Sequence, residues 1–217
     1  MRILLINPNS SELMSRAVQR EADKWCGPEL TVEVITSTLG PEIVSTDAQE
    51  RQAAAEVVEL ARRRGGAYDA MIVGCFSDPG LAAARQVVSI PVVGLLEASL
   101  AYAAGRGLRY SIVSSEGESD VKLFNQCAAA YGQAALLASV RWLDCGILPA
   151  LDERGPHLEQ TISTCFDQDG AELVIMGCAA FAGIRERLPE ALGRRVIDGV
   201  AQAIELAAER AAAFKQA

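Results

Sequence analysis

The stretch Ala70-Met71-Ile72-Val73-Gly74-Cys75 returns later in the chain as Leu173-Val174-Ile175-Met176-Gly177-Cys178. Each copy is a short apolar run of strand length that ends in Gly and Cys. The two cysteines lie 103 residues apart, and downstream of them residues 92–94 align with residues 196–198 at an offset of 104. Self-similarity at one spacing is the signature of a repeated structural unit, so the sequence predicts an internal duplication.

Upstream of the cysteines the repeat continues more loosely, with residues 3–7 aligning with residues 110–114 at an offset of 107. Apolar runs of strand length alternate with longer segments of helical period throughout the chain. Strands are expected at residues 2–6, 30–35, 70–74, 91–96, 108–113, 139–143, 173–177 and 195–197. Helices are expected at residues 11–24, 47–64, from 78–80 onward, after 96 to 104, at 119–131, at 156–168, after 178 to about 188, and at 199–214.

This alternation predicts the α/β class, with two similar parallel-sheet units related by pseudo-two-fold symmetry. The best boundary is Gly105-Arg106-Gly107, which divides the chain into an N-terminal half, 1–105, and a C-terminal half, 106–217. The last helix of either half can pack on the other half. Because ligands bind outside the carboxyl ends of strands in open α/β sheets, we expect the active site in the cleft between the halves.

Composition and charge exclude several classes of partner and ligand for this chain. The formal charge of −8 and the pI of about 4.8 argue against nucleic acid and anionic membrane surfaces. The N-terminal apolar run is too short for a signal peptide, and no stretch reaches the length of a membrane helix, so a cytoplasmic protein is expected. Six cysteines without a C-x-x-C pair, and a single histidine, make a structural zinc site unfavourable.

Cys75 and Cys178 are the candidate catalytic residues, because each follows a Gly at the end of an expected central strand. A helix start after each cysteine would supply free N–H groups and partial positive charge, which favour the thiolate. A thiolate is a competent base and a thiol a competent acid. One thiol on each wall of a cleft is the arrangement that racemisation needs. Cys26, Cys127, Cys145 and Cys165 lack this symmetry and are expected to be packing residues.

The loops after the first strand of each half complete the expected site. Ser10 or Ser11 is expected to cap the helix that follows the first loop, and Asn9 is the preferred substrate contact. Ser114 and Ser115 occupy the equivalent place in the second half. In the loop after the first cysteine, Asp78 is expected to cap the next helix, with Pro79 at its first position.

Four motifs carry a family resemblance: residues 6–10 (Ile-Asn-Pro-Asn-Ser), 74–81 (Gly-Cys-Phe-Ser-Asp-Pro-Gly-Leu), 91–94 (Pro-Val-Val-Gly) and 177–180 (Gly-Cys-Ala-Ala). The chain resembles the aspartate/glutamate/hydantoin racemase superfamily, and within it the hydantoin and allantoin racemases. The resemblance implies proton transfer by Cys75 and Cys178 without metal, pyridoxal phosphate or another cofactor. It also implies a small-molecule substrate, a homo-oligomer, and a pocket lined by Asn9, Phe76, Ser77, Ser114, Ser115 and Ala179.

The resemblance has departures that bear on the substrate. Hydantoin-type members commonly have Gly where this chain has Ser77, and Gly-Met where it has Ala180-Phe181. Phe76 and Ala179 suggest an apolar wall, which favours a 5-substituted hydantoin or a related cyclic ureide such as allantoin. The alternatives are an aspartate- or glutamate-type racemase, a maleate isomerase, an arylmalonate decarboxylase, and a small-molecule binding module without catalysis.

Overall fold

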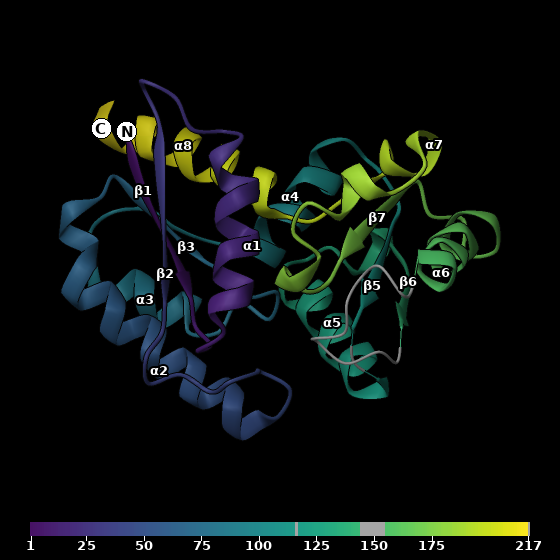
Figure 1. Ribbon diagram of the computed structural model, residues 1–217, viewed down its shortest axis with the longest axis horizontal. Helices are drawn as coiled ribbons and strands as arrows, with labels where there is room; N and C mark the ends of the chain where they lie inside the picture. The colour runs from purple at the N-terminus through teal and green to yellow at the C-terminus, as the bar shows by residue number, and fades with distance from the viewer. Residues whose placement is uncertain (116, 144–154, 217) are drawn as a thin grey trace. The chain divides into compact units, whose positions relative to one another are not determined.

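Two compact units make up the chain: residues 1–98 together with 200–217, and residues 99–199 (Figure 1). The computed structural model describes residues 1–115, 117–143 and 155–216. Each unit is built on a four-stranded sheet in which all paired strands run parallel. The predicted α/β class and its two similar units are confirmed.

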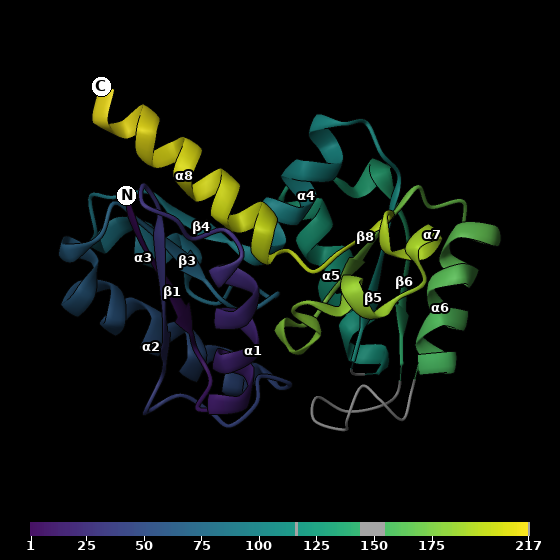
Figure 2. The same cartoon turned by 45° about the horizontal axis from the view of Figure 1, so that its top comes forward.

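The sheet of the first unit has the strand order β2-β1-β3-β4. Its strands are β1 (Arg2–Asn7), β2 (Thr31–Thr36), β3 (Ala70–Val73) and β4 (Val92–Gly94). Its helices are α1 (Glu12–Asp23), α2 (Asp47–Arg64), α3 (Leu81–Val87), the start of α4 (Leu95–Gly105) and α8 (Val200–Gln216). Helix α1 contacts α8, which lies along β3 and β4, whereas α2 contacts α3 (Figure 2).

The second unit repeats this plan, with the strand order β6-β5-β7-β8. Its strands are β5 (Tyr110–Ser114), β6 (Leu137–Trp142), β7 (Leu173–Met176) and β8 (Val196–Ile197). Its helices are α5 (Glu118–Ala130), α6 (Gly155–Asp167) and α7 (Glu190–Gly193). The strand register reproduces the repeat, because Ile6 pairs with Val73 and Val113 with Met176.

The central strands are apolar because helices cover both faces of a parallel sheet. Every residue of β3, β5 and β7 is buried. On one side of the first sheet, Leu4, Ile6 and Met71 pack against Val57 and Ala61 of α2. The two cores therefore hold the strand ends rigidly, and these ends carry the cysteines.

Two predicted elements are wrong in form. The expected helix after Cys178 is replaced by two short 3₁₀ segments, Ala179–Phe181 and Ile184–Arg187. The expected strand at residues 91–96 is shorter, because Leu95 already begins α4. Gly183, with a φ of 79°, separates the two 3₁₀ segments, and its left-handed backbone prevents one continuous helix.

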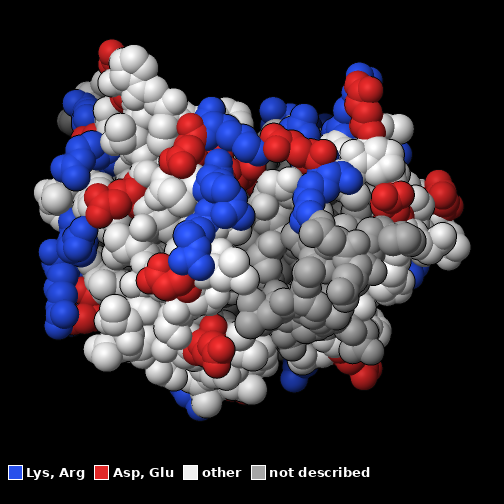
Figure 3. Space-filling view, viewed as in Figure 1, with Lys and Arg blue, Asp and Glu red and all other residues white. Residues whose placement is uncertain are grey.

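Charged side chains of both signs are mixed on the described part of the face in Figure 3. The net charge of −8 is therefore not gathered into a single acidic patch there. Among the described helices, none combines the length and the apolar character that crossing a membrane requires.

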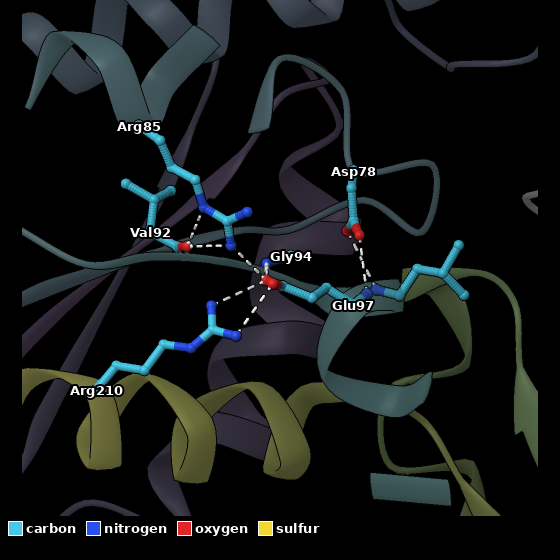
Figure 4. A network of polar contacts seen from close by, with 7 residues as sticks. Asp78, Arg85, Val92, Gly94, Glu97 and Arg210 are labelled. Carbon is cyan, nitrogen blue, oxygen red and sulfur yellow. Dashed lines mark hydrogen bonds and ion pairs between the residues drawn. The ribbon is translucent and has the colours of Figure 1, made fainter. Parts of the chain in front are cut away.

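Glu97 joins three elements of the first unit (Figure 4). Its carboxylate accepts hydrogen bonds from Arg85 of α3 at 2.6 Å and from Arg210 of α8 at 3.1 Å. Arg85 also donates to the backbone oxygen of Val92 in β4 at 2.8 Å. Burial raises the pKa of the Glu97 carboxyl, but the two guanidinium groups outweigh it, so the net pKa lies below its ordinary value.

We expect Glu97→Gln to lower the free energy of unfolding near neutral pH by roughly 1–2 kcal/mol, because two charge-assisted bonds are lost. Since the folded pKa of Glu97 is lowered, its stabilisation is full above the unfolded pKa and declines as pH falls through the folded value. The difference between wild type and variant, measured by urea denaturation, must therefore shrink in acid. Glu59→Gln, which breaks an exposed pair with Arg63, is the control and should change stability by less than about 0.5 kcal/mol.

Candidate active site

Each sheet has a topological switch point beside its cysteine. The chain leaves β1 toward β2 on one side and returns as β3 on the other side, and β5, β6 and β7 repeat this course. Cys75 follows β3, and Cys178 follows β7, at the carboxyl ends of these strands. Such crevices are where open α/β sheets bind ligands.

The glycine before each cysteine is required by close packing. A Cβ on Gly74 would lie 2.6 Å from the Leu5 side chain and 2.8 Å from the Ile6 carbonyl oxygen. A Cβ on Gly177 would lie 2.8 Å from the Ile112 side chain. Only glycine therefore fits before each cysteine, where the chain leaves the sheet and turns.

Both cysteines begin equivalent tight turns. The Cys75 carbonyl accepts the Asp78 N–H at 3.0 Å, and the Cys178 carbonyl accepts the Phe181 N–H at 3.0 Å. Both cysteines are half-buried. The helix predicted to open at residues 78–80 is present as α3, which begins at Leu81, whereas the helix predicted after Cys178 is wrong, because a 3₁₀ turn follows that cysteine. No α-helix therefore begins at the residue that follows either cysteine.

Asp78 caps a different helix from the one predicted. Its carboxylate accepts the backbone N–H groups of Leu96 at 3.1 Å and Glu97 at 2.8 Å, at the start of α4 (Figure 4). Its backbone is left-handed, with a φ of 50°, and Gly80 is the residue before α3. The carboxylate ties the cysteine loop to the end of β4. It fills the space that a Cβ on Gly94 would need, 2.2 Å away.

The second unit makes an equivalent contact, but there the aspartate follows the strand and the N–H group lies in the cysteine loop. Asp198, directly after β8, accepts the backbone N–H of Gly183 in the loop after Cys178 at 2.7 Å. Asp198 aligns with Gly94 in the sequence repeat, and Gly183 aligns with Gly80. In each unit one aspartate thus fastens the cysteine loop to the neighbouring strand end.

Cys75 is linked through a hydroxyl to a carboxylate. Its sulfur lies 3.4 Å from the Ser77 Oγ, and Ser77 donates to the Glu50 Oε2 at 2.8 Å. Burial raises the pKa of Glu50, the bond from Ser77 lowers it, and Asp47 raises it further, so that the net pKa is raised. Sequence reasoning missed Glu50, because it lies on α2, far from the cysteine in the chain and without a motif.

Asn9 lies at the rim loop after β1, but its side chain is only 3% exposed. Its Oδ1 accepts the Ser11 N–H at 2.9 Å and an N–H of the Asn7 side chain at 2.9 Å. Its Nδ2 faces the Met14 sulfur at 3.3 Å. Ser11 caps α1 as predicted, accepting the Met14 N–H. In this structure Asn9 therefore holds its own loop against the first turn of α1.

The serines of the second rim loop are buried at the end of β5. Ser114, which pairs with Trp142 of β6 in the register, has a buried Oγ without a hydrogen-bond partner among the described residues. Ser115 is 3% exposed. A buried hydroxyl that lacks a partner is costly, unless a ligand supplies one. Ser114 therefore stays a candidate substrate contact.

Phe76 and Ala179, each next to a cysteine, have buried side chains, at 2% and 3% exposure. Ser77 and Ala180, one residue further on, are half-buried. Near Cys75 the partly exposed neighbour is therefore the hydroxyl of Ser77, and near Cys178 it is the methyl group of Ala180.

The remaining cysteines differ in their surroundings. Cys165 of α6 is fully buried, and desolvation raises the pKa of its thiol to about 11, which suits a packing residue. Cys26 is half-buried and accepts the Val32 N–H at 3.3 Å. Cys127 on α5 is also half-buried, whereas Cys145 lies outside the described residues.

The fold and the site together define a class of protein: duplicated parallel α/β units, each with one thiol at the switch point of its sheet. The family model described as Asp/Glu/Hydantoin racemase matches residues 3–207. The chain belongs to the Asp/Glu/hydantoin racemase family.

Individual relatives agree with the family. The chain is 31% identical to a hydantoin racemase of Paenarthrobacter aurescens over 212 residues, which covers 95% of this chain and 89% of the relative. It is also 31% identical to a hydantoin racemase of Rhizobium meliloti, over 95% of this chain and 87% of the relative. Among solved structures, the allantoin racemase from Klebsiella pneumoniae superposes with a TM-score of 0.91 at 25% identity, covering 98% of this chain and 88% of that one.

Proposed function

We propose that this racemase-family protein inverts the chiral carbon of a 5-substituted hydantoin or a related cyclic ureide such as allantoin. Cys75 and Cys178 act as the acid/base pair, and no cofactor takes part. The observation that carries the proposal is the equivalent placement of the two half-buried thiols at the switch points of duplicated sheets. The similarity to the hydantoin racemase of Paenarthrobacter aurescens and to the allantoin racemase from Klebsiella pneumoniae supports the substrate class.

The chemistry needs one thiolate and one thiol. The thiolate sulfur takes the proton from the chiral carbon, and the electron pair of the C–H bond moves to the neighbouring carbonyl oxygen. The thiol then delivers its proton to the opposite face, and the electron pair returns to form the new C–H bond. The roles of Cys75 and Cys178 are exchanged after each turnover, so both enantiomers are substrates.

The negative charge that develops on the carbonyl oxygen needs a hydrogen-bond donor. Ser114 is the side chain best suited to this contact, because its buried hydroxyl has no partner among the described residues. Backbone N–H groups of the turns after the cysteines, together with Ser77, Ser115 and Ala179, are proposed to complete the pocket. Asn9 is proposed to contribute by holding the rim loop, and Phe76 by packing behind Cys75.

The proposal is tested with single enantiomers of a 5-substituted hydantoin and of allantoin in deuterated water. We expect loss of optical rotation, accompanied by uptake of one deuterium at the chiral carbon of the inverted product. Retained rotation with every hydantoin and ureide would refute the substrate class. Aspartate, glutamate, maleate and arylmalonates, the substrates of the alternative readings, would then be assayed in the same way.

We also propose that the protein is a homo-oligomer and that it works in the cytoplasm. The first is checked by light scattering of the purified protein, where a mass near that of one 23.0 kDa chain would refute it. The second is checked by fractionation of cells that express the full chain.

A further inference from the structure

We propose that Glu50, acting through Ser77, holds a proton on Cys75 and so makes Cys75 the proton donor of the resting enzyme. The inference rests on the proposed two-cysteine function and assigns an initial role to each thiol. Glu50 is a positioning residue in this scheme, because its hydrogen-bonded link to the reacting sulfur runs through the Ser77 hydroxyl.

The direction of the hydrogen bonds carries the first step. A serine hydroxyl has one hydrogen, and an ionised carboxylate can only accept. Ser77 gives its hydrogen to Glu50 at 2.8 Å, so its lone pairs face the Cys75 sulfur 3.4 Å away. The proton of that contact must then come from the Cys75 S–H group. The chain of bonds therefore favours the thiol form of Cys75.

Forming the thiolate disturbs this arrangement. Ser77 would have to turn its hydrogen from Glu50 to the sulfur, which leaves a half-buried carboxylate with one bond fewer. The negative charge of Glu50 also opposes a second negative charge on the sulfur nearby. Both effects act in the same direction and keep the proton on Cys75.

Among the described residues, the charge that acts most on Glu50 has the same sign. Asp47, three residues earlier on α2, adds negative charge and raises the pKa of Glu50. On α3, which packs against α2, the guanidinium of Arg85 is engaged by Glu97 and by the Val92 carbonyl. Glu59, further along α2, pairs with Arg63.

The two units differ at this point, because the position equivalent to Ser77 is Ala180, which has no hydroxyl to relay a carboxylate. A two-thiol reaction requires one protonated and one ionised cysteine at the start of a turnover. With the proton held on Cys75, Cys178 is the base in the resting enzyme. The enantiomer that presents its C–H bond to Cys178 reacts with the resting enzyme. The other enantiomer reacts only with the form in which Cys75 is the thiolate and Cys178 the thiol.

The test is the alkylation rate of each cysteine, followed by peptide mass spectrometry with iodoacetamide across neutral and alkaline pH, without substrate. We expect Glu50→Gln to raise the rate at Cys75 about threefold near neutral pH, and to move its pH profile toward acid. The gain is smaller than the increase in thiolate, because a less basic thiolate is a weaker nucleophile. Ser77→Thr keeps the hydroxyl, so the alkylation rate of Cys75 in this variant, measured without substrate, should match that of the wild-type protein.

The relay is tested by combining substitutions. If Glu50 acts mainly through Ser77, then Glu50→Gln should raise the Cys75 rate clearly less in a Ser77→Ala background than in the Ser77 background, because only the direct effect of the charge remains. Glu59→Gln removes a carboxylate elsewhere on the same helix and should leave the Cys75 rate unchanged. Cys26, a half-buried thiol of the same unit, is the internal reference in every sample.

An unchanged or slower Cys75 rate in Glu50→Gln would overturn the proposal, and an equal effect in both Ser77 backgrounds would overturn the relay through the hydroxyl. Racemisation by the wild-type protein is measured in parallel. Absent racemisation with the expected alkylation pattern would refute the proposed function alone. Racemisation with no change at Cys75 would refute the relay alone.

Discussion

Cys75→Ala and Cys178→Ala will each abolish racemisation, and each will leave solvent hydrogen exchange with one enantiomer only. Loss of one partner of the acid/base pair should lower the rate by roughly a thousandfold or more. The cysteine that remains can still remove and return a proton on its own face, so deuterium enters without inversion. We therefore expect the two variants to label opposite enantiomers, measured by NMR after chiral separation.

Cys26→Ala is the matched control, since it removes a half-buried thiol of the first unit away from β3. It should racemise at the wild-type rate. Racemisation that survives in either single variant would contradict the two-cysteine mechanism. Exchange of both enantiomers by one variant would show that a single base reaches both faces.

Asp78→Ala will lower the free energy of unfolding by about 2–3 kcal/mol, the largest stability loss expected from a residue outside the cores. One buried and one half-buried N–H group at the start of α4 lose their acceptor, and alanine must adopt a left-handed backbone with a φ of 50°. Asp78→Asn keeps one acceptor oxygen and tolerates this backbone, so its loss should be about 1 kcal/mol. Urea denaturation measures both.

The hydrogen bond between Asp198 and Gly183 predicts a smaller loss of stability. Asp198→Ala removes the bond to Gly183 and should cost roughly 1–2 kcal/mol. Because both aspartates hold a cysteine loop, both variants should also lower kcat more than they raise KM, measured on the substrate found active. A stability loss in Asp78→Asn as large as that in Asp78→Ala would contradict the capping role.

Local pattern determined most of the fold. The eight strands of the described residues were predictable because apolar runs of strand length must be buried on both faces of a parallel sheet. The offsets of 107 and 103 between the halves return as equivalent strand pairs, Ile6 with Val73 and Val113 with Met176. Helix α2 begins and ends at the residues predicted, since its capping box at Thr46 and Gln49 is a local signal.

The sequence alone thus determined the duplicated α/β plan, the place of Cys75 and Cys178 at two strand ends, and the family. Only the tertiary structure decided which polar groups serve these thiols. Asp78 caps α4 rather than the helix that follows it, and Glu50 reaches Cys75 through Ser77. The reason is physical: strand burial follows from the local spacing of apolar residues, whereas the partner of a carboxylate depends on which distant backbone or hydroxyl the packed elements bring within hydrogen-bond distance.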